Sequence, residues 1–161
     1  MATDTSYTLD QFFADTRETM KTTGVPSGLA EIRDHLEKLL RNPELLGLRS
    51  GTKGAEAFTG LPELCGLARH KNVAVKASAL PCYSTEGYPF SDVHPHIRRV
   101  YDAFGPQRMF WGTDWTRLPC PWRQAVTLFT EELPWLSAGD KEWIMGRAIC
   151  EWLDWPRPRS A

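Results

Sequence analysis

Residues 107–115 read Gln-Arg-Met-Phe-Trp-Gly-Thr-Asp-Trp and contain the strongest strand candidate of the chain. Three large apolar residues, Met109 to Trp111, follow one another without polar alternation, which is typical of a parallel strand covered on both faces. In α/β folds, ligands bind at the carboxyl ends of such strands, and Asp114 lies just beyond this one. Asp114 is therefore the leading catalytic candidate. The alternative is that its side chain only caps the turn that follows.

A second strand candidate covers residues 72–78, which read Asn-Val-Ala-Val-Lys-Ala-Ser. A short helix is predicted before it, and helix followed by strand is the order of a βα barrel. Ser78 ends this strand, and Lys76, two positions earlier, points the same way if the strand is regular. Both are substrate-binding candidates. For Lys76 an ion pair, or a stem packed against helices, is an equally good interpretation.

Helical periodicity and capping residues predict most of the remaining elements. A short apolar run at 45–48 is a doubtful strand, and the loop 79–91 is long enough for a functional lid. Ser137 and Asp140 are spaced as the capping box of the last helix. The predicted helices cover residues 8–21, 28–41, 61–68, 93–104, 122–133 and 137–153.

Composition indicates one folded domain without a nucleic-acid or membrane partner. The chain has 161 residues, of which 42% are hydrophobic, and this is enough for a sizeable core. A net charge of -1, without a basic stripe, excludes the usual nucleic-acid and membrane surfaces. The four cysteines show no C-x-x-C spacing and no secretory signal is recognised, so we expect a cytoplasmic protein with reduced thiols.

The segment Phe-Trp-Gly-Thr-Asp-Trp at 110–115, together with 72–78 and Tyr88-Pro-Phe90, resembles the amidohydrolase-related family of TIM-barrel hydrolases and decarboxylases. The resemblance runs from about Leu46 to Trp155. It implies that Asp114, at the end of the eighth strand, binds a divalent metal such as zinc or manganese or activates water. It also implies a small-molecule substrate.

Two or three strands are too few for a closed barrel, which needs eight. We therefore expect an α/β fold that is an incomplete (β/α)8 TIM barrel. Its C-terminal βα units would occupy residues 44–161, and residues 1–43 would form a helical segment without a recognised counterpart in the family. The family's His-x-His metal motif on the first strand is absent from the chain. Homo-oligomerisation, or a missing N-terminal half, would satisfy the exposed strand edges.

The four histidines of the chain lie at three sites. His94-Pro-His96 matches His-x-His as text, but it lies at a predicted helix start, where side chains two apart diverge, and Asp92 is expected to cap that helix. His35 lies in the sequence Asp34-His-Leu36, which resembles a motif that the family carries at the end of a strand. Here it falls within a helical pattern, which favours a surface or boundary position. His70 is expected to be solvated.

Two functions follow. The resemblance favours a hydrolase of a small cyclic ester, lactone or amide, or a related carboxylic acid decarboxylase, in which Asp114 activates water. Arg117 would then bind a substrate carboxylate through its bidentate fork. The alternative is a catalytically inactive derivative of the fold that serves as a structural or interaction module.

Overall fold

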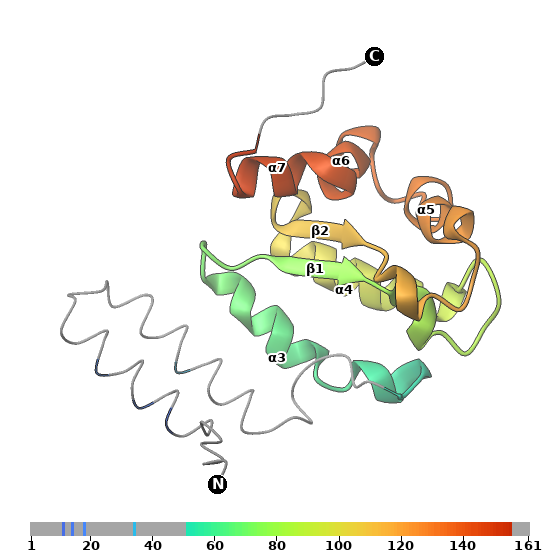
Figure 1. The fold of residues 1–161 in the computed structure, drawn as a ribbon, viewed down its shortest axis with the longest axis horizontal. Helices are drawn as coiled ribbons and strands as arrows, with labels where there is room; N and C mark the ends of the chain where they lie inside the picture. The colour runs from blue at the N-terminus through green and yellow to red at the C-terminus, as the bar shows by residue number, and fades with distance from the viewer. Residues whose placement is uncertain (1–10, 12–13, 15–17, 19–33, 35–50, 156–161) are drawn as a thin grey trace, which may run out of the picture. The chain divides into compact units, whose positions relative to one another are not determined.

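The computed structural model describes residues 11, 14, 18, 34 and 51–155. Residues 11, 14, 18 and 34, each helical, are the described part of the predicted helices at 8–21 and 28–41. The doubtful strand at 45–48 and His35 lie outside the described residues. Residues 51–155 form a mixed helix and strand structure (Figure 1). None of the helices described there is long and apolar enough to cross a membrane.

Two short parallel strands form the sheet (Figure 1). Strand β1 (Val75–Ser78) pairs with β2 (Met109–Gly112), and the register sets Val75 opposite Met109 and Ser78 opposite Gly112. Both strands were predicted from sequence, and the structure confirms them. Each is shorter than predicted, because the residues before it form turns instead of a strand.

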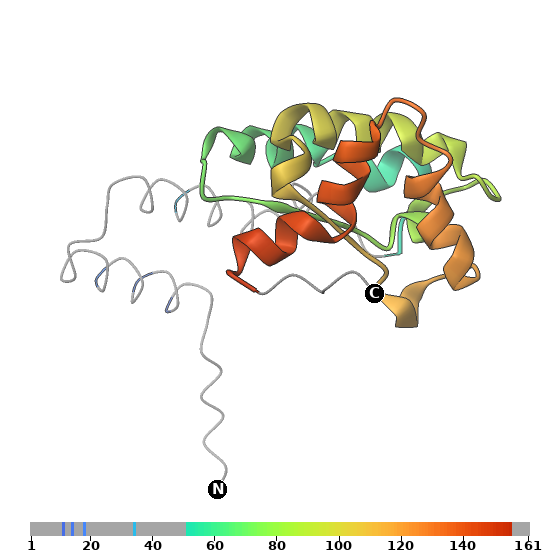
Figure 2. The ribbon, with the colours of Figure 1, turned by 90° about the horizontal axis from the view of Figure 1, so that it is seen from above.

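Helices α3 (Leu61–Gly66) and α4 (His94–Phe104) lie on one side of the strands (Figure 2). Proline stands in the first turn of each, where its missing N–H leaves no helical bond unmade. The buried side of α4 carries Ile97, Val100 and Phe104, which are spaced as neighbours on one helical face. These helices were predicted, and they bury the Val75 and Met109 side of the sheet.

The other face of the sheet is only partly covered among the described residues. The side chain of Lys76 is 61% exposed, whereas Met109 on the helix-covered face is fully buried. Phe110 is half-buried beneath Trp152, whose ring lies 5.8 Å away. The prediction that both strands are buried on both faces is therefore wrong, because α3 and α4 cover only one face of the sheet.

The last predicted helix consists of three pieces. Helix α6 (Ala138–Glu142) begins at Ser137, and the predicted capping box is present: Ser137 Oγ accepts from the Asp140 N–H, and the Ser137 N–H donates back to the Asp140 carboxylate. A π-helical turn, Trp143–Arg147, then joins α6 to α7 (Ala148–Trp152). Trp152 and Leu153, at the end of the helix predicted at 137–153, are exposed because α7 ends at the surface.

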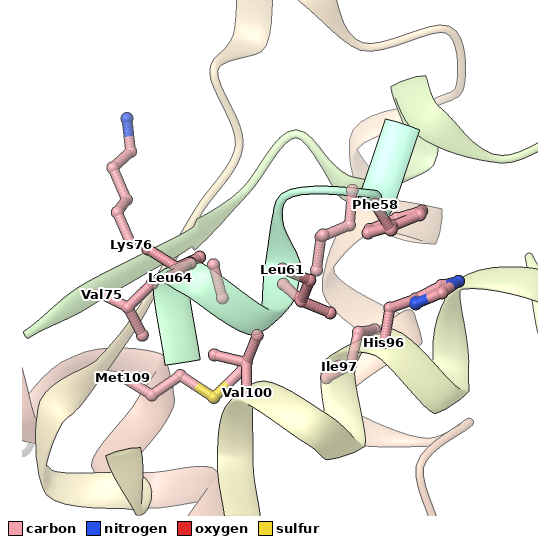
Figure 3. A pocket seen from close by; sticks show the side chains of 11 residues that line it. Phe58, Leu61, Leu64, Val75, Lys76, His96, Ile97, Val100 and Met109 are labelled. Atoms are coloured by element: carbon pink, nitrogen blue, oxygen red, sulfur yellow. The ribbon is translucent and has the colours of Figure 1, made fainter. Parts of the chain in front are cut away.

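Helix α5 (Trp122–Thr130) follows the loop after β2, as predicted, and it buries Leu128 and Phe129. A small apolar cavity of about 30 Å³ lies between β1, α3 and α4 (Figure 3). Its lining includes Leu61 and Val100, and the Lys76 side chain points away from it. A space this small, with a mostly apolar lining, is part of the core packing.

Candidate functional site

Asp114 lies two residues beyond β2 and begins a 3-10 turn, Trp115–Arg117. Its backbone is left-handed, with φ at 47°, an unusual conformation for a residue other than glycine. Its side chain makes no capping hydrogen bond to that turn. The interpretation of Asp114 as a simple turn cap is therefore wrong, because its carboxylate is directed at the neighbouring strand instead.

Both carboxylate oxygens of Asp114 accept hydrogen bonds from β1. Lys76 Nζ lies 2.5 Å from Oδ1, and Ser78 Oγ donates to Oδ2 at 3.0 Å. Lys76 and Ser78 are two residues apart in one strand, so their side chains share a face, as the sequence predicted. Of the interpretations given for Lys76, the structure shows the ion pair.

Gly112 leaves room for this arrangement. It pairs directly with Ser78 across the sheet. A Cβ at this position would lie 3.2 Å from Lys76 Cε and 3.2 Å from Ser78 Cβ, which is closer than ordinary carbon contacts of about 3.5–4.0 Å. Sequence reasoning did not single out Gly112 as part of the site. The signal available was a glycine next to the strand's carboxyl end, where a close approach is common.

The surroundings keep Asp114 ionised. The hydrogen bond from Lys76 is the largest cause of a lowered pKa for its carboxyl, and the Ser78 hydroxyl and the Arg117 charge act in the same direction. Partial burial acts in the opposite direction and is outweighed. At neutral pH Asp114 is therefore an anion that accepts protons, although a lowered pKa also weakens it as a base.

The loops beyond the strands bring Arg117 and Cys82 close together. Arg117 donates from its guanidinium to the Tyr83 hydroxyl at 3.3 Å and lies over that ring, 5.7 Å from its centroid. Cys82 donates its thiol to the Arg117 carbonyl at 2.6 Å. Burial raises the pKa of the Cys82 thiol, so it does not act as a ready thiolate, and Cys120 is raised for the same reason.

The His-x-His text at 94–96 does not form a site. His94 Nε2 lies 2.8 Å from the Pro89 carbonyl, while the His96 ring stacks on Phe58 with centroids 3.8 Å apart. Burial lowers the pKa of His96. The two rings have different partners, as the helix-start interpretation predicted.

Two other expectations are wrong. Asp92 does not cap α4; instead, its carboxylate accepts from Ser84 and from the Thr85 backbone N–H at 2.7 Å, which closes the preceding loop. His70 is buried, with 8% of its surface exposed, and its Nε2 accepts from Arg69 at 3.1 Å. Proximity to Lys71 in sequence suggested solvent, but the chain folds over the ring.

A divalent metal does not fit the residues that the structure describes. Among them, no three His, Cys, Asp or Glu side chains come together as a ligand set. Both Asp114 oxygens are taken by hydrogen-bond donors, and the Lys76 ammonium beside Oδ1 would repel a cation. We therefore derive no chemical step through a metal.

Three comparisons with known proteins bear on this site. The model of a family described as amidohydrolase matches residues 49–150, which include Asp114 and both strands. L-fucono-1,5-lactonase of Burkholderia ambifaria is 46% identical over 52 residues, covering 30% of this chain and 17% of that protein. The chain thus spans less than a fifth of that relative's length. No solved structure matches the chain significantly.

Proposed function

The chain belongs to the amidohydrolase family, and we propose that it contributes the carboxylate of a hydrolase that opens a small cyclic ester. The observation that carries the proposal is the Asp114 carboxylate, held ionised by Lys76 and Ser78 at the carboxyl ends of β1 and β2. We prefer a lactone to an amide as the substrate because the relative that matches part of the chain is named as a lactonase. Decarboxylation of a related acid is the neighbouring chemistry, and no contact in the site favours it.

In the proposed reaction, water attacks the lactone carbonyl carbon while an Asp114 oxygen takes one of its protons. The tetrahedral intermediate then breaks the bond to the ring oxygen, which leaves and receives that proton from Asp114. One lactone and one water give one hydroxy acid, and Asp114 is regenerated as the anion. The acid product loses its own proton to solvent.

Lys76 has two tasks in this proposal. In the free site it neutralises Asp114, and its largely exposed stem lets the ammonium swing towards a bound carbonyl oxygen. There it would donate to the developing oxyanion. When the Lys76 ammonium leaves Oδ1, the main cause of the lowered Asp114 pKa is removed, so the carboxylate becomes a stronger base as substrate arrives.

We propose that Ser78 orients Asp114 beside the substrate and that Arg117 binds the rest of the substrate. Ser78 keeps Oδ2 in place through its hydroxyl, so that Asp114 retains its orientation when Lys76 moves. Among the described residues, Arg117 forms no direct ion pair with a carboxylate. Its contact with Tyr83 leaves other guanidinium donors available to a substrate carboxylate. We propose a cytoplasmic location, which the four free cysteines support.

The alternative function is a non-catalytic derivative of the fold. It is favoured by one observation: in the candidate site the described residues place a single carboxylate, Asp114, and its lowered pKa makes it a weak base. A panel of aldonic and hydroxy-acid lactones, each beside its lactam, separates the two functions. We expect the purified chain to open at least one lactone faster than buffer does, and the matched lactam more slowly. No turnover across the panel would leave the non-catalytic derivative as the function.

A further inference from the structure

We propose that Gly112 is a positioning residue, whose missing side chain allows Lys76 and Ser78 to hold both carboxylate oxygens of Asp114. The inference starts from the register, in which Gly112 lies opposite Ser78 while Phe110 lies opposite Lys76. Residues two apart in a strand share a face, so the bare position at Gly112 lies on the face that carries Lys76 and Ser78. Asp114 follows it by two residues.

The two contacts that a Cβ would make differ in what they can yield. Ser78 Cβ is fixed by its strand, so relieving a 3.2 Å contact there requires the strands themselves to shift. Lys76 Cε belongs to a flexible stem, so relieving the second 3.2 Å contact displaces the ammonium instead. Either movement displaces a hydrogen-bond partner of Asp114, because Ser78 moves with its strand and the Lys76 ammonium moves with its own stem.

A glycine in another element, Gly66, does not have this role. Gly66, within α3, would meet nothing within 4 Å if it carried a Cβ, and its φ of -59° suits alanine. Gly66→Ala is therefore a matched control that adds the same methyl group without touching the site. The catalytic meaning of Gly112 rests on the proposed function, but its effect on the Lys76 ion pair does not.

The test measures the Lys76 ion pair directly, without any lactone. Reductive methylation with formaldehyde and borohydride is followed at each lysine by mass spectrometry, with Lys71 and Lys141 as internal references. An ammonium held by a carboxylate must leave it before it can lose a proton and react. Asp114→Asn should therefore speed labelling of Lys76 by roughly twofold to fivefold, the range expected for an exposed ion pair.

We expect Gly112→Ala to raise labelling of Lys76 alone, to a level similar to that in Asp114→Asn. The double variant Gly112→Ala, Asp114→Asn should label Lys76 no faster than Asp114→Asn, because Gly112 acts through that pair. Gly66→Ala should match the parent chain. Unchanged Lys76 labelling in Gly112→Ala would overturn the proposal, as would additive effects in the double variant or an Asp114→Asn variant that labels Lys76 no faster.

Faster labelling of every lysine in Gly112→Ala would report a loosened fold instead of a displaced side chain. Gly112→Ala combined with Ser78→Gly then decides, because it removes the contact with the fixed Cβ and keeps the contact with Lys76. Against Ser78→Gly alone, the proposal expects faster labelling at Lys76 only. Equal labelling of Lys76 in these two variants would overturn it.

Discussion

Lys76 Nζ lies 2.5 Å from Asp114 Oδ1, although the two residues are 38 positions apart in the chain. The contact exists because β1 and β2 are paired in parallel, which brings the end of each strand to the same edge. The side chains are 61% and 29% exposed, so water screens the pair and its contribution to stability is about 0.2–1 kcal/mol. Its larger effect is on the chemistry of the carboxylate.

Replacing Lys76 by methionine should raise the pKa of Asp114 towards its ordinary value. Methionine keeps a similar unbranched stem and removes the ammonium, which is the main cause of the lowered pKa. A carbon-13 NMR titration of the Asp114 carboxyl measures this directly. Lys141→Met is the matched control, because Lys141 donates to the Thr130 carbonyl and not to Asp114.

The same change has a consequence for stability that depends on pH. Because the folded pKa of Asp114 is lowered, its ionised form stabilises the fold above the unfolded pKa, and that stability is lost as the pH falls through the folded pKa. Lys76→Met should therefore lose less stability than the parent chain between about pH 6 and pH 3. Urea unfolding midpoints at the two pH values test this, and equal losses would contradict it.

The chain should hold divalent zinc or manganese no more tightly than about millimolar, which is typical of an isolated carboxylate. Among the described residues, Asp114 is already occupied by donors and His94 and His96 have separate partners. Metal analysis after dialysis tests the prediction. Stoichiometric zinc would contradict it, and repeating the analysis on Asp114→Asn would show whether Asp114 is a ligand.

Deleting residues 1–43 should make the chain more prone to associate. In the described part, β1 and β2 pair only with each other, so each strand has an outer edge with unpaired amides and carbonyls. The side chains of Trp115 and Trp155 are 63% and 59% exposed in the described part of the chain, which adds apolar surface. Light scattering after size exclusion should show oligomers or aggregates that increase on deletion. A cooperatively unfolding monomer that tolerates the deletion would contradict the incomplete-barrel argument.

Much of the local structure was predictable because it depends on short-range patterns. The apolar run at 109–111 indicated a strand, the spacing of Ile97, Val100 and Phe104 indicated a helix, and the Ser137 and Asp140 pair indicated a capping box. Each of these signals is read within about one turn of the chain. The sequence predicted that Lys76 and Ser78 share a face, but it did not identify Asp114 as their common partner.

What the sequence did not reveal depends on packing between distant residues. The sequence around His70 carries no sign that its side chain is buried. Residues distant in the chain pack against it: Arg108, for example, donates from its guanidinium to the His70 backbone carbonyl at 2.9 Å. The sequence did not single out Gly112, and its role emerged only from the register with Ser78. Exposure of Lys76 likewise follows from which face the helices cover.

The central claim is that the Asp114 carboxylate accepts the proton of the attacking water, and turnover of the Asp114→Asn variant tests it most directly. The variant keeps the shape of the side chain but cannot accept that proton, so kcat/KM on the best lactone of the panel should fall by about two orders of magnitude or more. Asp102→Asn removes an exposed carboxylate that pairs with Arg98 at 2.7 Å on α4, and it should retain the parent rate. An Asp114→Asn variant that is as active as Asp102→Asn would contradict the account.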